Sequence, residues 1–87
     1  MMDNRTNSFK LTPELSRAGR GWFGWSQREL AERAGVSIAT VNDFERNKRT
    51  PIHNNLNSIK LVFISEGLVF QFDEMGHPIG FIYKGDK

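Results

Sequence analysis

The sequence has 87 residues, a formal net charge of +2 at pH 7 and no cysteine. This length fits a single small domain, and the lack of cysteine excludes disulfides, cysteine-ligated metal sites and cysteine nucleophiles. No secretory leader and no apolar run of about 18 residues is found, so we expect a cytoplasmic protein that neither crosses nor enters a membrane.

The basic residues are concentrated in the first part of the chain. Residues 1–52 hold nine Lys or Arg against six acidic residues, whereas residues 53–87 hold three against four. A content of 25% charged residues is ordinary for a protein surface. The charge pattern is therefore weak evidence for a nucleic-acid partner when it is taken alone.

Residues 1–11 are mostly polar and show no periodicity, which predicts a flexible arm. Arg5 and Lys10 are basic groups of this segment. A basic arm can reach into a DNA minor groove, while an untethered tail is the simpler interpretation.

A first helix is predicted to start after Thr12 as its N-cap, with Pro13 in the first turn, and to end near Phe23. Gly19 is expected to let a neighbouring helix or Trp25 approach closely. The expected inner stripe of this helix holds three residues: Leu15, Ala18 and Trp22.

The next helix is predicted over residues 27–34. Ser26 and Glu29 stand three residues apart, the spacing of a capping box. Gly35 then occupies the turn, where a glycine takes a left-handed conformation without steric cost.

Another start signal follows at once, because Ser37 can cap a helix over residues 38–46. Val41 and Phe44 are its expected inward positions. Two short helices joined by a tight turn are typical of a helix-turn-helix, whose second helix enters the major groove of DNA.

A fourth helix is predicted over residues 53–66, with Gly67 as its stop and a core stripe of Leu56, Ile59 and Phe63. Further apolar residues lie on its other faces, so it needs cover from the C-terminal segment or from a partner chain. These residues are Leu61, Val62 and Ile64.

Beyond Gly67 the apolar period changes from helical to two. Residues 68–72 and 79–83 read as strands with a turn at 73–78, which predicts a β-hairpin. An isolated hairpin is marginal in water. This one must pack its aromatic face on the fourth helix or pair an edge with another chain.

Residues 12–68 resemble the helix-turn-helix module of the Cro and phage-repressor family, also called the XRE family. The resemblance implies a mainly α fold, a lambda-repressor-like bundle of four short helices over residues 12–67. The C-terminal hairpin, in residues 68–87, is then an extension. The matching positions are Arg20, Gly24, Trp25, Ser26, Gln27, Leu30, Ala31, Gly35, Val36, Val41, Phe44, Glu45, Asn47, Lys48, Arg49, Thr50 and Pro51.

The resemblance also implies which residues face DNA. Base or phosphate contacts are expected on the exposed start and outer face of the third helix: Ser37, Ile38, Ala39, Thr40, Asn42 and Asp43. Gln27 opens the second helix, and its family counterpart bonds a phosphate. The expected cationic phosphate contacts are Arg28, Arg46, Lys48 and Arg49.

The base-reading positions carry no Arg or Gln, so strong direct readout of bases is not expected from them. The alternative for Asn42 and Asp43 is that they are ordinary solvent-exposed residues without a DNA contact. Arg20 and Glu45 correspond to a partly buried ion pair in similar proteins. We expect the same pair here, tying the first helix to the end of the third.

No catalytic or cofactor site is predicted. His53 and His77 are isolated and lack a second ligand at metal spacing, so no metal site and no enzyme activity are expected. The hairpin aromatics could stack on single-stranded bases, but core or dimer contacts are favoured for them. These residues are Phe70, Phe72, Phe81 and Tyr83.

These features predict a sequence-specific double-stranded DNA-binding transcriptional regulator, a nucleoid-associated repressor that binds a two-fold symmetric operator as a homodimer through the hairpin and helix four. One alternative is an antitoxin that represses its own gene and grips a toxin through the hairpin. A second is a scaffold that has lost DNA binding, suggested by the weakly basic third helix.

Overall fold

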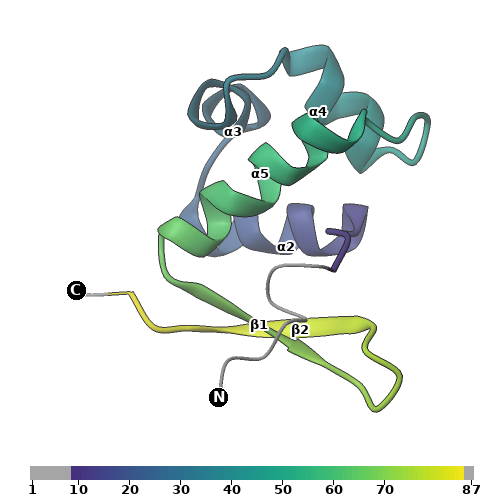
Figure 1. The fold of residues 1–87 in the computed structure, drawn as a ribbon. Coiled ribbons are helices and arrows are strands. Elements are labelled where there is room, and N and C mark those ends of the chain that lie inside the picture. The colour runs from purple at the N-terminus through teal and green to yellow at the C-terminus, as the bar shows by residue number, and fades with distance from the viewer. Residues whose placement is uncertain (1–8, 86–87) are drawn as a thin grey trace.

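Four helices followed by a two-stranded antiparallel hairpin make up the part of the chain, residues 9–85, that this computed structural model describes (Figure 1). The expected mainly α bundle with a C-terminal hairpin is confirmed. In chain order the elements are α2 (Pro13–Phe23), α3 (Gln27–Ala34), α4 (Ile38–Glu45), α5 (His53–Ser65), β1 (Leu68–Phe72) and β2 (Pro78–Tyr83).

The first two helices begin where their capping residues predict. The Thr12 hydroxyl accepts a hydrogen bond of 3.2 Å from the backbone N–H of Leu15, with Pro13 in the first turn. The Ser26–Glu29 capping box is closed by reciprocal hydrogen bonds of 2.9 and 3.0 Å. These bonds satisfy backbone N–H groups that have no partner inside a helix.

The remaining elements match their expected bounds to within one residue. The Ser37 hydroxyl caps α4 by accepting from the Thr40 N–H at 3.0 Å. Helices α4 and α5 end at Glu45 and Ser65, each one residue earlier than predicted, and β2 begins at Pro78, one residue earlier than predicted.

The buried face of α2 differs from the expected one. Ala18 and Trp22 are exposed, and Trp22 keeps 56% of its surface accessible. Leu15 is buried as expected, but Gly19 is buried in place of Ala18 and Phe23 packs against the core in place of Trp22, so the inner stripe follows the i, i+4 spacing rather than i, i+3. Ala18 and Trp22 were predicted to be buried because they are apolar. The close approach of α5 instead requires glycine, the smallest residue, at the buried position 19.

Gly19 provides that close approach, as expected. A Cβ atom on Gly19 would lie 2.7 Å from Cε1 and 2.9 Å from Cδ1 of Phe63, whose side chain is fully buried. The Phe63 ring also stacks on Trp25, with ring centroids 6.0 Å apart. The α2–α5 contact therefore depends on a residue without a side chain.

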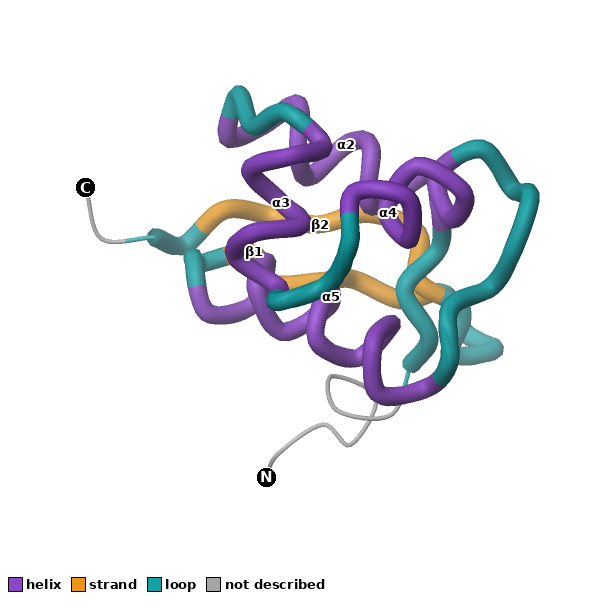
Figure 2. Tube along the Cα trace, turned by 90° about the horizontal axis from the view of Figure 1, so that it is seen from above, coloured by secondary structure: helices purple, strands orange, loops and turns teal. Residues whose placement is uncertain are grey.

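The hairpin packs on its own chain, beneath α2 and α5 in Figure 1 and under the helices in the view of Figure 2. Leu68 and Phe70 of β1 are buried, and Phe81 pairs directly with Phe70 across the strands. The opposite face carries the cross-strand pair Val69 and Ile82, which are 40% and 41% exposed. The aromatic face of the hairpin thus supplies cover for helix α5.

The core begins earlier in the chain than predicted. Phe9 and Leu11 are buried, so the expected arm over residues 1–11 does not extend to this point, and Arg5 lies outside the described residues. The Phe9 ring lies 5.0 Å from the ring of Phe70 and 5.1 Å from that of Phe72. Polar neighbours masked these two apolar residues in the sequence, and their partners come from the other end of the chain.

Candidate nucleic-acid interface

Helices α3 and α4 are locked together by the turn between them. Gly35 has a left-handed φ of 70°, and the Val36 N–H donates to the Ala31 carbonyl at 3.0 Å. Leu30 and Val41 are fully buried beneath the two helices. This packing fixes the angle between α3 and α4 and leaves the outer face of α4 exposed, the geometry of a helix-turn-helix.

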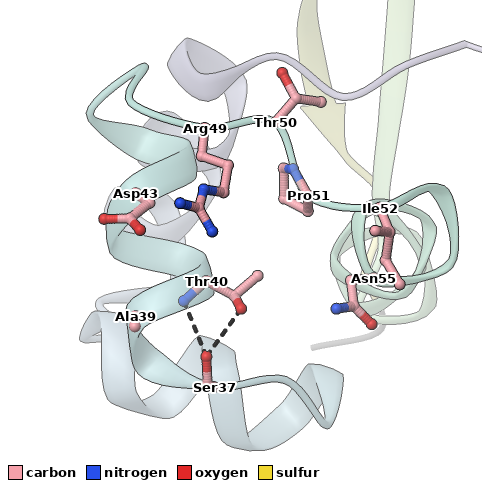
Figure 3. A pocket seen from close by; sticks show the side chains of 9 residues that line it. All are labelled: Ser37, Ala39, Thr40, Asp43, Arg49, Thr50, Pro51, Ile52 and Asn55. Carbon is pink, nitrogen blue, oxygen red and sulfur yellow. Dashed lines mark hydrogen bonds between the residues drawn. The ribbon is translucent and has the colours of Figure 1, made fainter.

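The start of α4 borders an open cavity of about 370 Å³. Figure 3 shows the cavity between α4 on one side and the loop into α5 on the other. Its lining is polar at the α4 side, where the Ser37 and Thr40 hydroxyls hydrogen-bond at 2.8 Å. The complete lining is Ser37, Ala39, Thr40, Asp43, Arg49, Thr50, Pro51, Ile52 and Asn55.

The predicted cationic residues lie on α3, at the end of α4 and on the loop that follows it. All four are exposed: Arg28, Arg46, Lys48 and Arg49. Lys48 and Arg49 also line a second cavity of about 270 Å³ together with Lys10. The loop that carries them is held by backbone hydrogen bonds from the Lys48 and Arg49 N–H groups to the Asp43 carbonyl, at 2.8 and 3.3 Å.

Helix α5 begins beside the same loop without a side-chain cap. Its N-cap position is Ile52, which offers no hydrogen-bonding side chain, whereas α3 and α4 have serine caps. The first N–H groups of a helix point along its axis and favour anions. The uncapped start of α5 borders the same cavity, because Ile52 and Asn55 line it together with Arg49.

Arg20 and Glu45 lie in direct contact beneath this surface. Arg20 Nη2 is 2.7 Å from Glu45 Oε1, and Arg20 Nε donates to both carboxylate oxygens at 3.0 and 3.1 Å. The Glu45 side chain is 1% exposed, that of Arg20 21%. The bidentate contact joins α2 to the last residue of α4.

Burial raises the pKa of Glu45, but hydrogen bonds outweigh this effect and leave the pKa below its ordinary value. The largest of these lowering contributions comes from Arg20, followed by Ser16 and then Gln27. The Ser16 hydroxyl donates to Glu45 Oε2 at 2.6 Å. Sequence analysis missed Ser16, although its position one helical turn before Arg20 places both on the same face of α2.

Gln27 and Asn42 extend this network to the outer part of α4. Gln27 Nε2 donates to Glu45 Oε1 at 3.1 Å, and Gln27 Oε1 accepts from Asn42 Nδ2 at 3.1 Å. The two amides are half-buried. Fifteen residues separate Gln27 from Asn42 in the sequence, so no local pattern indicated that they would meet.

The two histidines and the hairpin aromatics considered from the sequence do not form a separate site. His77 Nδ1 is 3.4 Å from Asp73 in the hairpin turn, and His53 is exposed at the start of α5. Within residues 9–85 no group of three potential metal ligands occurs, and no helix has the length and apolarity to cross a membrane. Phe70 is a core residue, not an exposed stacking surface.

Comparison with known families supports the assignment of this surface. Residues 17–51 match a family model described as helix-turn-helix, and they span the segment from α2 to the loop before α5. The comparison with curated proteins gives no match to this chain. Residues 17–51 are thus similar to a helix-turn-helix of the Cro and phage-repressor type, also called the XRE family, and this match supports a DNA-binding transcription regulator in general.

Proposed function

We propose that this protein is a repressor that recognises a specific double-stranded DNA sequence and occupies a two-fold symmetric operator as a homodimer. The observation that carries the proposal is the exposed start of α4 beside a loop with two cations and the uncapped start of α5. A surface of this kind combines base-reading side chains with phosphate-binding groups, which specific recognition requires.

The base contacts are assigned to α4. Ser37, Ile38 and Ala39 are exposed at its first turn, and Thr40, Asn42 and Asp43 are half-buried along it. Ile38 and Ala39 suit a thymine methyl, Asn42 an adenine edge and Asp43 a cytosine amino group.

The phosphate contacts are assigned to the surrounding residues. Arg28 and Arg46 flank the helix-turn-helix, and Lys48 and Arg49 lie on the loop after α4. Gln27 has one remaining amide hydrogen for a phosphate, because its amide oxygen and its other hydrogen are engaged by Asn42 and Glu45. Lys10 is added to this group because it lines the same cavity as Lys48 and Arg49.

The homodimer is assigned to the outer face and free edges of the hairpin. Val69 and Ile82 form an exposed apolar pair there, and Ile79 is 65% exposed in β2. Within residues 9–85 the sheet has two strands, so each strand has an edge with no neighbouring strand. A second copy can pair antiparallel with such an edge across a two-fold axis.

The same apolar face supports the alternative function of an antitoxin. An antitoxin would use α4 for repression of its own gene and the Val69–Ile82 face for a toxin partner. A monomer that binds DNA without an enriched two-fold motif, together with a stable complex with a toxin, would favour this alternative.

The proposal is tested by selecting and sequencing duplexes from a randomised pool at two salt concentrations. We expect an enriched two-fold symmetric motif and an affinity that falls steeply with salt. Absence of binding at both salt concentrations would contradict the proposal and favour a scaffold without DNA binding.

Dimer formation is tested separately by sedimentation equilibrium. The variant Ile82→Lys is expected to be monomeric and to enrich a half-site. Its matched control is Ala18→Lys, which adds the same charge at an exposed position of α2, outside the hairpin. Equal dimerisation of both variants and the wild type would exclude the Ile82 face as the interface.

A further inference from the structure

We infer that Gln27 is a positioning residue that sets which hydrogen-bonding edge Asn42 offers to a DNA base, under control of the carboxylate of Glu45. The inference rests on the proposed function, in which α4 reads bases. It adds a residue on α3 that determines specificity through Asn42, and a physical reason for the adenine preference at the position that Asn42 reads.

The first step is the state of Glu45. Its carboxylate is almost fully buried and accepts hydrogen bonds from Arg20 and Ser16. An ionised carboxylate accepts hydrogen bonds and cannot donate them. Any amide that hydrogen-bonds to it must therefore present its nitrogen.

The second step is the orientation of Gln27. Its Nε2 lies 3.1 Å from Glu45 Oε1, as the acceptor-only carboxylate requires. The amide oxygen of Gln27 consequently points away from Glu45, and Asn42 Nδ2 donates to it at 3.1 Å. If the Gln27 amide were reversed, its oxygen would face the carboxylate of Glu45 and its nitrogen would face Asn42 Nδ2, and both hydrogen bonds would be lost.

The third step is the edge that remains on Asn42. Its Oδ1 accepts no hydrogen bond from another side chain or backbone group within residues 9–85. Because no buried side-chain nitrogen or oxygen of these residues lacks a partner, this oxygen is open to solvent. Asn42 thus offers an acceptor and one remaining N–H to a ligand.

This pattern distinguishes between ligands. A carbonyl oxygen repels the oxygens of a phosphate, so Asn42 is better suited to a base than to the DNA backbone. An acceptor beside an N–H matches the N6 amino group and N7 of adenine. A neutral partner in place of Glu45 would not fix this polarity, because an amide can either donate or accept.

The test compares base preferences of the wild type, Gln27→Met and Arg28→Met in the same selection experiment. Methionine keeps the length of the Gln27 side chain and removes its hydrogen bonds. At the position read by Asn42, we expect the adenine preference to fall on the order of tenfold in Gln27→Met. Arg28→Met, at the adjacent exposed residue, should weaken binding to all sequences and leave that preference unchanged.

The double variant Gln27→Met/Asn42→Ala separates positioning from a general structural effect. If Gln27 acts through Asn42, its substitution should cause no further loss of adenine preference once Asn42 is alanine. Additive losses at that position would overturn the inference.

A second measurement does not require DNA. In the NMR spectrum of the free wild-type protein, the Asn42 amide hydrogen bonded to Gln27 should exchange with solvent more slowly than its geminal partner. This difference should disappear in Gln27→Met. Equal exchange of the two hydrogens in the wild type would contradict the inference that Gln27 orients the Asn42 amide. A wild type that enriches no motif would overturn the proposed function and the adenine assignment, whereas an enriched motif unchanged in Gln27→Met would overturn the inference alone.

Discussion

Two glycines of α2 should respond in opposite directions to the same substitution, Gly19→Ala and Gly21→Ala. They are two residues apart in one helix, so an added methyl group meets different surroundings. At Gly19 the new Cβ would lie 2.7 Å from a ring atom of Phe63, whereas at Gly21 it would meet no atom within 4 Å apart from its chain neighbours and the backbone of its own helix. Gly21 is also exposed.

The expected magnitudes follow from two effects. Replacing a helical glycine by alanine favours the helix by about 1 kcal/mol. At Gly21 nothing opposes this gain, so we expect stabilisation of about 0.5–1 kcal/mol. At Gly19 overpacking against a buried ring costs about 3 kcal/mol, near the upper end of its usual range, because Phe63 is fully buried and has no room to yield. The net result is destabilisation of about 2 kcal/mol.

Urea unfolding followed by circular dichroism, at one fixed protein concentration, measures both changes in free energy, and thermal unfolding measures the accompanying shifts in Tm. For a domain of this size, about 1 kcal/mol corresponds to a shift in Tm of roughly 4–8 °C. Gly21→Ala should therefore raise the Tm, and Gly19→Ala should lower it by roughly 10 °C. A Gly19→Ala protein as stable as Gly21→Ala would refute the close contact between Gly19 and Phe63.

Three further outcomes are expected. Arg20→Met should destabilise the fold by roughly 3 kcal/mol, because it leaves the buried Glu45 carboxylate without its main partner. Arg33→Met removes an exposed pair, 3.6 Å from Glu66, and should cost less than about 1 kcal/mol. Equal losses of stability in urea unfolding would contradict this ranking. Because the folded pKa of Glu45 is lowered, its stabilisation is present above the ordinary value of 4.5 and is lost as pH falls through the lower folded pKa. Between pH 6 and pH 3 the stability of the wild type should therefore decline more than that of Glu45→Gln, which keeps the lowered pKa values of Glu29 and Asp73. In filter binding to a selected duplex, Lys48→Ala and Arg49→Ala should each reduce the steepness of log K against log salt by about 0.9, while the hairpin variant Lys84→Ala should leave it unchanged.

Local signals were sufficient to predict the helices from the sequence. Thr12, Ser26 and Ser37 each hydrogen-bond a backbone N–H three residues later, so the start of each of these helices is determined within one turn. The change to a period of two after Gly67 likewise identified both strands. These features depend on neighbouring residues and are visible in any short window of sequence.

The errors arose where distant residues determine the packing. Trp22 was expected inside because it is large and apolar, but α5 contacts α2 at Gly19, and Trp22 packs at the hairpin edge with its ring 5.5 Å from that of Tyr83. Phe9 was assigned to an arm because its partners, Phe70 and Phe72, lie near the other end of the chain.

The candidate site was predictable in part. The family resemblance predicted an ion pair between Arg20 and Glu45, and the structure shows the two side chains in bidentate contact. The connection of Gln27 to Asn42 was not foreseen, because each residue had been considered separately as a DNA contact. Side-chain hydrogen bonds between two helices require an orientation that sequence spacing does not provide.

The contact between Phe9 and Phe70 has a consequence for the order of events during synthesis. The ribosome makes the chain from the N-terminus, and domains fold as their parts emerge. A nascent chain that ends at Ser65 contains all four helices but lacks Leu68 and Phe70, which complete the buried core. Its Phe9 segment has no aromatic partner until the hairpin emerges, so the helix-turn-helix should reach full stability only after residues 68–72 have left the ribosome.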